Sequence, residues 1–584
     1  MNTLVIVLIA AVVLVCAYAG YGRWLAKTWG VDPNAKTPAV RLEDGKDYVP
    51  TKGWTVFAHQ FSSIAGAGPV TGAIQAAAFG WLPVLLWVLI GGVFFGAVTD
   101  FGALYASVKN DGKSMGLLIE KYIGKTGRKL FLLFCWLFCG IVIAAFADMV
   151  AGTFNAFDAD GAQVEAAFTN GAAGMVSIMF MVFAVVFGFI QKKFNFSGWR
   201  EAVIGIIFIV LSFAVGMNCP LVFGKTAWSY ITFVYIFFAA VLPMWMLKQP
   251  RDYMTTFMFG AMIAGAVIGL LVAHPTMNLP VFTGFSNAKL GTMFPILFVT
   301  VACGAVSGFH SLVSSGTSSK TVENEKDMLK VGYGAMVLES LLAVLALCVA
   351  GAAAAADGTP ASGTPFQIFS RGVAGFFEMF GVPVSIATVF MTMCVSALAL
   401  TSLDAVARIG RMSFQELFSV DDMEHAEGWR KLCCNVYFST FITLVFGFIL
   451  TQIGYANIWP LFGSANQLLS ALVLATLCVF LKVTGHNNKM LFPPLVIMLC
   501  VTFTALVQRL IAMVKAISAA ASTAIPAGET TWGAVFIANG LQLILAVLLI
   551  VLGLNIVFHS VKSYTTCDAP EAKDNATATA KANA

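Results

Sequence analysis

Segment 57–72 places polar and helix-breaking residues inside a long apolar stretch. It contains a histidine, a glutamine, two serines and the run 66–69, which reads Gly-Ala-Gly-Pro. Proline removes a backbone donor and glycine loosens the backbone, so a regular helix cannot continue through this run. In hydrocarbon, irregular backbone persists only where it is buried in protein or lines a cavity. A broken, polar, buried helix is typical of the place where a transporter holds its substrate or ion.

Other apolar stretches also contain ionisable or amide side chains. Such groups are costly in a bilayer and usually face a bundle interior or a pathway. Stretch 298–316 is again rich in Gly and Ser, and small residues of this kind also serve simply to let helices approach closely. Amides bond between helices, and a histidine can be purely structural, so a structural role stays open for each residue. The polar residues within the apolar stretches are His59, Asp100, Asp148, His310, Glu339, Asn466, Gln467 and Arg509.

Two roles are predicted for these residues. Small residues let backbone groups reach a ligand, and hydroxyls and amides fix its orientation. Coupling to a proton needs a group that changes protonation between two states, and carboxylates and imidazoles can do this in a membrane. We assign proton coupling to Glu339 or Asp100, with His59 or His310 as relays. We assign substrate contacts to Ser62, Ser63, Gly66, Gly68, Ser307, His310, Ser314, Asn466 and Gln467.

The composition is that of an integral membrane protein. Of 584 residues, 59% are hydrophobic and only 11% charged, and the mean hydropathy is +0.86. Soluble domains carry about 25% charged residues. We therefore predict an all-α polytopic fold with about 15 transmembrane helices. The predicted spans are 4–27, 55–77, 82–108, 129–157, 172–190, 201–217, 226–247, 254–274, 292–316, 331–356, 383–403, 432–450, 459–481, 490–514 and 532–558.

The basic residues predict the orientation of the chain. With the N-terminus outside and the C-terminus in the cytoplasm, the cytoplasmic side holds 29 of the 34 Lys and Arg residues. This agrees with the excess of positive charge found on cytoplasmic loops. Several ionisable residues then fall in the cytoplasmic half of the membrane, which suggests a polar vestibule or proton path opening inward: His59, Asp100, His310, Glu339 and Asp404.

Residues 1–562 are predicted to form a single transmembrane domain, followed by a disordered cytoplasmic tail at 563–584. No nucleotide-binding, zinc, nucleophile-elbow or dinucleotide motif stands in a suitable context, so we expect no cofactor, no metal and no enzymatic activity. Transport would then be passive or driven by an ion gradient. The net charge of +5 follows from topology and indicates no nucleic-acid partner. The expected partners are a small-molecule substrate, a coupling ion and membrane lipid, and the oligomeric state stays open.

Several segments resemble the carbon starvation protein A family. They occur in the family's order between residues 40 and about 495, at 44–51, 57–72, 96–101, 242–245, 249–253, 302–316, 332–339, 401–411 and 459–467. Two features depart from the family pattern. The usual pair of histidines in the second span is His59 followed by Gln60 here, and the C-terminus is shorter than in the long enteric members.

The resemblance implies a secondary transporter of the bacterial inner membrane, in the amino acid–polyamine–cation superfamily. The family is linked to proton-coupled uptake of small peptides or of pyruvate during carbon starvation, and both substrates carry a carboxylate that a helix N-terminus can bind. The implied fold is two inverted five-helix repeats, each with a broken first helix. Span 2 suits the first broken helix. The second is either span 7, which holds Pro243, or the more polar span 9. A transporter-like nutrient sensor that signals to a cytoplasmic partner is the alternative function.

Overall fold

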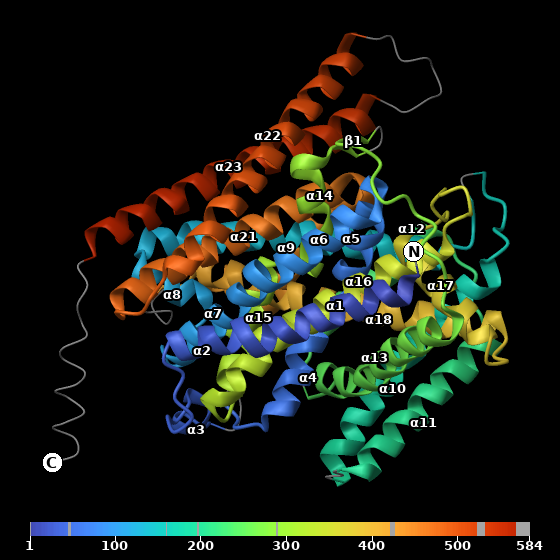
Figure 1. Cartoon of the computed structure of the whole chain (residues 1–584), viewed down its shortest axis with the longest axis horizontal. Helices are drawn as coiled ribbons and strands as arrows, with labels where there is room; N and C mark the ends of the chain where they lie inside the picture. The colour runs from blue at the N-terminus through green and yellow to red at the C-terminus, as the bar shows by residue number, and fades with distance from the viewer. Residues whose placement is uncertain are drawn as a thin grey trace.

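The computed structural model describes residues 2–44, 48–158, 160–194, 198–243, 245–287, 290–420, 427–522 and 532–567. The described chain is almost entirely helical (Figure 1), and a short antiparallel pair of strands, β1 (Ser286–Asn287) and β2 (Gly291–Thr292), joins two helices. The helices are α1 (Thr3–Ala17), α2 (Arg23–Thr28), α3 (Pro38–Arg41), α4 (Gly53–Ile64), α5 (Gly68–Ala76), α6 (Trp81–Gly91), α7 (Ala97–Val108), α8 (Met115–Tyr122), α9 (Lys125–Phe154), α10 (Ala167–Phe194), α11 (Trp199–Asn218), α12 (Lys225–Val241), α13 (Lys248–Ala273), α14 (Met293–Val301), α15 (Gly308–Gly316), α16 (Ala335–Ala353), α17 (Pro365–Glu378), α18 (Val384–Phe418), α19 (Gly428–Cys433), α20 (Val436–Thr451), α21 (Tyr455–Val483), α22 (Phe492–Ser522) and α23 (Trp532–Thr566).

The structure is an all-α polytopic membrane protein, as the composition predicts. Within the described residues, 12 helical segments are long and apolar enough to cross a membrane, fewer than the 15 predicted spans. Two other predicted spans correspond to the shorter apolar helices α12 and α20, and a third is divided between α4 and α5. The last helix, α23, ends at Thr566, a little beyond the predicted start of the tail. Positions 568–584 of that tail lie outside the described residues.

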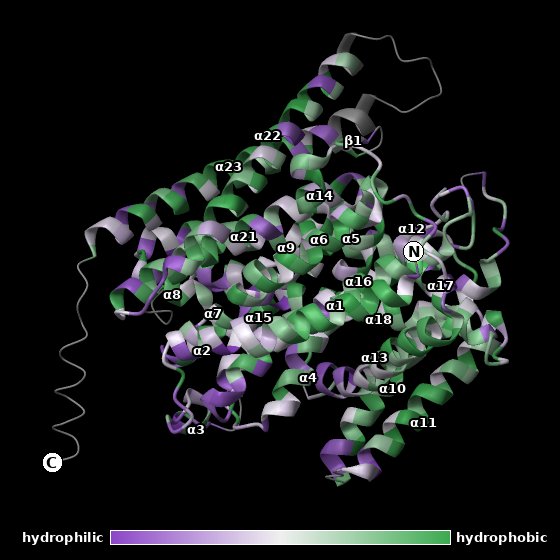
Figure 2. Cartoon of the chain, in the orientation of Figure 1, coloured by the Kyte–Doolittle hydropathy of each residue, from purple (hydrophilic) through white to green (hydrophobic). Residues whose placement is uncertain are grey.

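Burial divides the helices into an inner and an outer group. The apolar window of α21 is completely buried, and that of α9 is 83% buried, whereas only 28% of the α1–α2 window is buried. Helices at the periphery, such as α1, α11 and α23, present apolar residues along most of their length (Figure 2). A surface of this kind suits lipid, because no water is present in the bilayer core to solvate polar groups. The helices α9, α18 and α21 therefore form a scaffold around the polar segments.

The predicted break in the second span is confirmed. Helix α4 ends at Ile64, α5 begins at Gly68, and residues 65–67 between them are not helical. Pro69 occupies the first turn of α5, where its missing N–H group is not needed for the helical bonding pattern. The whole of segment 60–73 is buried, so both ends of the interrupted helix face protein and not lipid.

A second broken segment lies at span 9, which answers the question of register left open by the sequence. Here α14 ends at Val301, a single 3₁₀ turn spans Ala302–Gly304, and α15 starts at Gly308. Ala302 has a φ of +39°, a conformation that is unfavourable for a residue with a Cβ. In contrast, Pro243 of span 7 lies after the end of α12 and does not interrupt a helix.

The two broken segments run antiparallel and pack against each other. The first half of one contacts the second half of the other, with α4 against α15 and α5 against α14. This is the arrangement expected for corresponding helices of two inverted repeats. Both breaks also contact the scaffold, since α21 packs on the 3₁₀ turn and α18 packs on α4. The antiparallel pair therefore brings four helix ends together inside the bundle.

Candidate functional site

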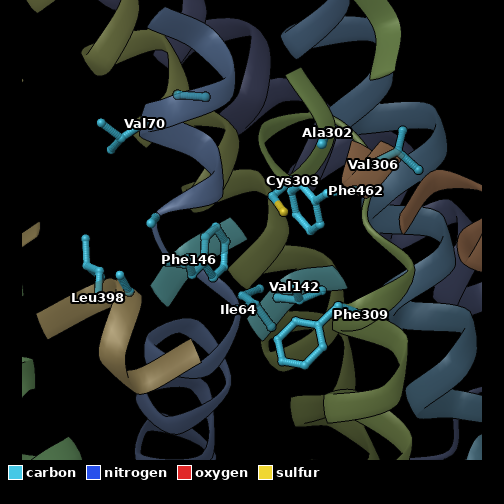
Figure 3. Packing of buried hydrophobic residues seen from close by; sticks show 14 of the residues in the cluster. Ile64, Val70, Val142, Phe146, Ala302, Cys303, Val306, Phe309, Leu398 and Phe462 are labelled. Carbon is cyan, nitrogen blue, oxygen red and sulfur yellow. The ribbon is translucent and has the colours of Figure 1, made fainter. Parts of the chain in front are cut away.

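A narrow pocket lies at the two helix breaks. The space within it is only about 10 Å³, far below the ~300–1,000 Å³ typical of ligand pockets, so its walls are closed on each other in this structure. Figure 3 shows several of its lining side chains, among them Phe146, Phe309 and Phe462, which come from different helices. The few polar groups among them are the Cys303 thiol, the Ser402 hydroxyl and the Asn466 amide. The lining residues are Ile64, Gly66, Gly68, Phe138, Val142, Phe146, Cys303, Phe309, Ser402, Val406, Phe462 and Asn466.

Two glycines allow the pocket walls to approach each other. A Cβ at Gly66 would lie 2.1 Å from Ser402 Oγ, and a Cβ at Gly68 would lie 2.6 Å from Cys303 Sγ. Both distances are shorter than the ~3.5–4.0 Å of normal non-bonded contacts. The first amide groups of α5 have no acceptor within their own helix and carry partial positive charge. The break therefore places a helix N-terminus, without side chains in the way, at the edge of the pocket.

Asn466 of α21 holds the second break in place. Its Oδ1 accepts a hydrogen bond from the Phe309 amide at 3.1 Å, and its side chain is also bonded to the Ser307 hydroxyl, with Asn466 Nδ2 3.0 Å from Ser307 Oγ. Asn466 Nδ2 also donates to Cys303 Sγ at 3.4 Å. These bonds satisfy backbone and side-chain groups that the interruption of the helix would leave without partners. Asn466 is thus both a wall of the pocket and the support of α15.

Three buried ionisable side chains form a line on the other side of α15. His310 Nδ1 lies 3.1 Å from Asp100 Oδ2 of α7, and His310 Nε2 lies 3.3 Å from Glu339 Oε2 of α16. The second contact lacks hydrogen-bond alignment, and all three side chains are 0% exposed. The imidazole separates the two carboxylates, so the three groups do not converge on one point as metal ligands do. We call Asp100, His310 and Glu339 the buried trio.

The trio and the pocket are joined through one turn of helix. Phe309 lines the pocket, and the next residue, His310, belongs to the trio. Cys303 also lines the pocket and lies within electrostatic range of Glu339. A movement of the first turn of α15 would therefore act on the pocket and on the trio at once.

The other predicted site residues lie near the pocket but do not line it. The Ser62 hydroxyl donates to the His59 carbonyl at 3.2 Å, and the buried Ser63 hydroxyl has no hydrogen-bond partner. Ser314 Oγ accepts from Gln60 Nε2 at 2.8 Å, which joins α4 to α15. Gln467 Nε2 donates to the Phe298 carbonyl at 2.7 Å.

The sequence analysis predicted His59 as a proton relay for Glu339 or Asp100. In the structure, His59 lies apart from the buried trio. His59 is half-buried on α4, and the nearest charges acting on it are those of Lys248 and Asp252 on α13. Conversely, His310 was predicted both as a substrate contact and as a relay. His310 contacts Asp100 and Glu339 and is not among the residues that line the pocket.

Of the predicted substrate contacts, Gly66, Gly68 and Asn466 line the pocket, but sequence reasoning did not single out its apolar walls. Phe138 and Phe146 of α9 and Phe462 of α21 are apolar residues in apolar spans, so nothing distinguishes them from lipid-facing residues. Ser402 and Cys303 were identifiable, since both fall in segments that carry the family resemblance, at 401–411 and 302–316.

Comparison with known proteins gives the family of the chain. Its sequence matches the profile described as carbon starvation protein CstA over residues 2–362 and 352–505. The chain belongs to this family. The peptide transporter CstA of Escherichia coli (strain K12) is 32% identical over 556 residues, covering 82% of this chain and 77% of that protein. The pyruvate/proton symporter BtsT of the same organism is 30% identical over 594 residues, covering 86% and 81%. Both relatives of this CstA-family chain are named as transporters.

Among solved structures, the chain is similar to a manganese transporter from Eremococcus coleocola. The match covers 89% of this chain and 99% of that chain, with 10% sequence identity and a TM-score of 0.49. The protein MhsT, solved in complex with L-phenylalanine, matches over 87% of this chain and 99% of that chain, with 13% identity and a TM-score of 0.44.

Proposed function

We propose that this CstA-family protein is a secondary active transporter that couples the uptake of a small carboxylate-bearing solute to a proton. The observation that carries this proposal is the position of the buried trio directly behind the pocket, across the first turn of α15. The relatives named as a peptide transporter and as a pyruvate/proton symporter support the same class of activity. Small peptides and pyruvate are therefore the candidate substrates.

The trio has the charge properties of a proton carrier. Two ionised carboxylates beside a neutral imidazole would place two negative charges where the side chains are 0% exposed. Removing ions from water costs several kcal/mol each after relaxation, so the enclosed trio is expected to hold one or two protons. When an inward- or outward-open state admits water, that cost falls and a proton can leave. Enclosure and exposure thus change the number of bound protons, which is what coupling requires.

Once its walls move apart, the pocket suits a small solute with a carboxylate. The N-terminus of α5 offers amide donors and partial positive charge to an anion. The remaining wall is largely apolar, with Phe146, Phe309 and Phe462 against the body of the solute. Entry of the solute would displace Phe309, and because Phe309 and His310 are adjacent, the same displacement would alter the distances within the trio. Binding and protonation are therefore linked through α15.

We also propose the orientation and the location. The excess of Lys and Arg in the loops of one side supports a cytoplasmic location for that side in a bacterium, with the N-terminus outside and the C-terminus inside. The membrane is then the inner, or plasma, membrane. On this orientation α4 and α15 form the cytoplasmic halves of the two broken helices.

The test is uptake by purified protein in liposomes. Radiolabelled pyruvate and radiolabelled dipeptides are supplied outside, with and without an inward pH gradient. We expect one of the two to accumulate above equilibrium only with the gradient, and a protonophore to abolish the accumulation. Accumulation driven by a sodium gradient alone would contradict the proton as the coupling ion. Accumulation of neither solute under any gradient would contradict the proposed substrate class.

A further inference from the structure

A second cluster of charged side chains is buried beside the pocket and has no part in the roles described so far. Arg251 of α13 is 2% exposed, and its guanidinium binds Asp404 of α18 and the Tyr235 hydroxyl of α12. The same guanidinium lies 3.0 Å from Asp252, and Tyr235 donates to Asp404 Oδ2 at 2.9 Å. Lys248 is also buried. We call Tyr235, Lys248, Arg251, Asp252, Asp404 and Arg408 the inner network.

The inner network lies between the pocket and the basic end of the bundle. Ser402 and Val406 of α18 line the pocket, and Asp404, two residues from each, lies on the opposite face of the same helix. One turn further along α18, Arg408 donates to the Leu242 carbonyl at 2.9 Å, beyond the end of α12. Helix α4 contacts both α13 and α18. The network therefore joins three helices around the first half of the broken α4–α5 segment.

The network holds an excess of positive charge. Lys248, Arg251 and Arg408 carry three positive charges and Asp252 and Asp404 carry two negative charges, so one positive charge is not compensated. A buried ion pair often contributes little net stability, because desolvation offsets the attraction. A fold that retains several such groups in one place has another use for them. An excess cation beside a pocket favours an anion that leaves the pocket in this direction.

We propose that the inner network is the cytoplasmic gate of the transport path, and that Arg251 recognises the substrate carboxylate as the gate opens. This rests on the proposed function for the direction of transport and for the carboxylate. In the closed state the Arg251–Asp404 pair holds α13 against α18. In the open state Arg251 exchanges the carboxylate of Asp404 for that of the substrate, which suits the planar, two-pronged donor geometry of a guanidinium.

The gate is tested without any substrate, through the native thiol of Cys303. Membrane vesicles of either orientation are treated with a membrane-impermeant maleimide, and labelling at Cys303 is measured by peptide mass spectrometry. Removing one partner of a buried pair is strongly unfavourable to the paired state. We therefore expect Asp404→Asn to raise labelling from the cytoplasmic face roughly tenfold or more, with no change from the outer face. A rate equal to wild type, or an equal rise from both faces, would overturn the gate.

Asp148→Asn is the matched control. Asp148 pairs with Lys225 at 2.8 Å and accepts from the Tyr455 amide, at the opposite end of the bundle. This variant also loses a paired carboxylate, so it reports any general loosening. Its labelling from the cytoplasmic face should equal that of the wild type, and a tenfold rise here would show that the Asp404 effect is not specific.

The double variant Arg251→Gln/Asp404→Asn separates the two roles of Arg251. Glutamine and asparagine can hydrogen-bond without charge, and Asp252 still supplies a negative charge near Lys248, so labelling of Cys303 should return to within about threefold of wild type. Uptake in liposomes should stay lost, because the proposed carboxylate receptor Arg251 is gone and the Arg408 guanidinium is held by the Ala239 and Leu242 carbonyls. If the double variant regains uptake, Arg251 does not recognise the substrate carboxylate. If its Cys303 is labelled as strongly as in Asp404→Asn, the Arg251–Asp404 pair is not what closes the gate. Labelling needs neither substrate nor proton gradient. The labelling result therefore tests the gate independently of the proposed transport function.

Discussion

Gly68 should not tolerate a single added methyl group. In Gly68→Ala the new Cβ would lie 2.6 Å from Cys303 Sγ and 2.7 Å from Cys303 Cβ. The sulfur can rotate away, but the Cβ is fixed to the backbone, so α5 and the 3₁₀ turn at Ala302–Gly304 must separate. Overpacking of this kind typically costs about 1–3 kcal/mol. Alanine recovers about 1 kcal/mol over glycine in a helix, so we expect a net loss of up to about 2 kcal/mol.

The measurements are the thermal unfolding midpoint of the purified protein and its uptake in liposomes. Gly68→Ala should lower the midpoint and reduce uptake severalfold, since the methyl group also enters the pocket. Gly260→Ala is the matched control, because a Cβ at Gly260 of α13 has no neighbouring heavy atom within 4 Å. The double variant Gly68→Ala/Cys303→Gly removes the opposing side chain and should restore the midpoint. If Gly68→Ala behaves like Gly260→Ala in both measurements, the close approach of the two helix breaks is refuted.

Two further variants test the support of the site and the connection between α21 and α22. Asn466→Ala removes the acceptor of the buried Phe309 amide, which should cost about 1–3 kcal/mol and abolish uptake. Asn457→Ala, at an exposed position of the same helix, should change neither, and a wild-type midpoint for Asn466→Ala would contradict the role of that amide. His486 lies between α21 and α22. Its pKa is lowered mainly by burial and, to a smaller extent, by the nearby Lys109 ammonium. The folded protein therefore resists protonation there, so the stability present above about pH 6.5 should decline as the pH falls below that value. His486→Gln should remove this part of the decline in unfolding midpoints measured between pH 5 and 8, and an unchanged pH profile would contradict the assignment.

The sequence predicts the first helix break well because that break is local. Glycine, glycine and proline at 66–69 act through their own backbone preferences. The second break has no proline within it, and Ala302 adopts a positive φ that its residue type disfavours. Its conformation depends on Asn466, more than 150 residues away, which bonds Phe309 and Ser307. A tertiary contact of this kind leaves no local pattern, so the sequence could not choose between spans 7 and 9.

For the buried charges, too, the sequence reveals the individual residues but not the tertiary contacts between them. Asp100, His310 and Glu339 stand out one by one as ionisable groups within apolar spans. Their meeting in one line depends on the packing of α7, α15 and α16, which no spacing in the sequence reveals. Arg251 was missed because residues 248–253 fall between two predicted spans and would be a hydrated loop. Helix α13 begins earlier, at Lys248, and this turn is buried against α18.

The central claim is that the buried trio carries the coupled proton, and the most direct measurement compares two modes of transport in the same liposomes. Counterflow exchange needs binding and conformational change but no net proton movement, whereas uphill uptake needs the pH gradient. We predict that Glu339→Gln or Asp100→Asn removes gradient-driven accumulation while counterflow persists at a rate within a few-fold of wild type. If both variants still accumulate the solute against its gradient when only a pH difference is imposed, the trio is not the site of proton coupling.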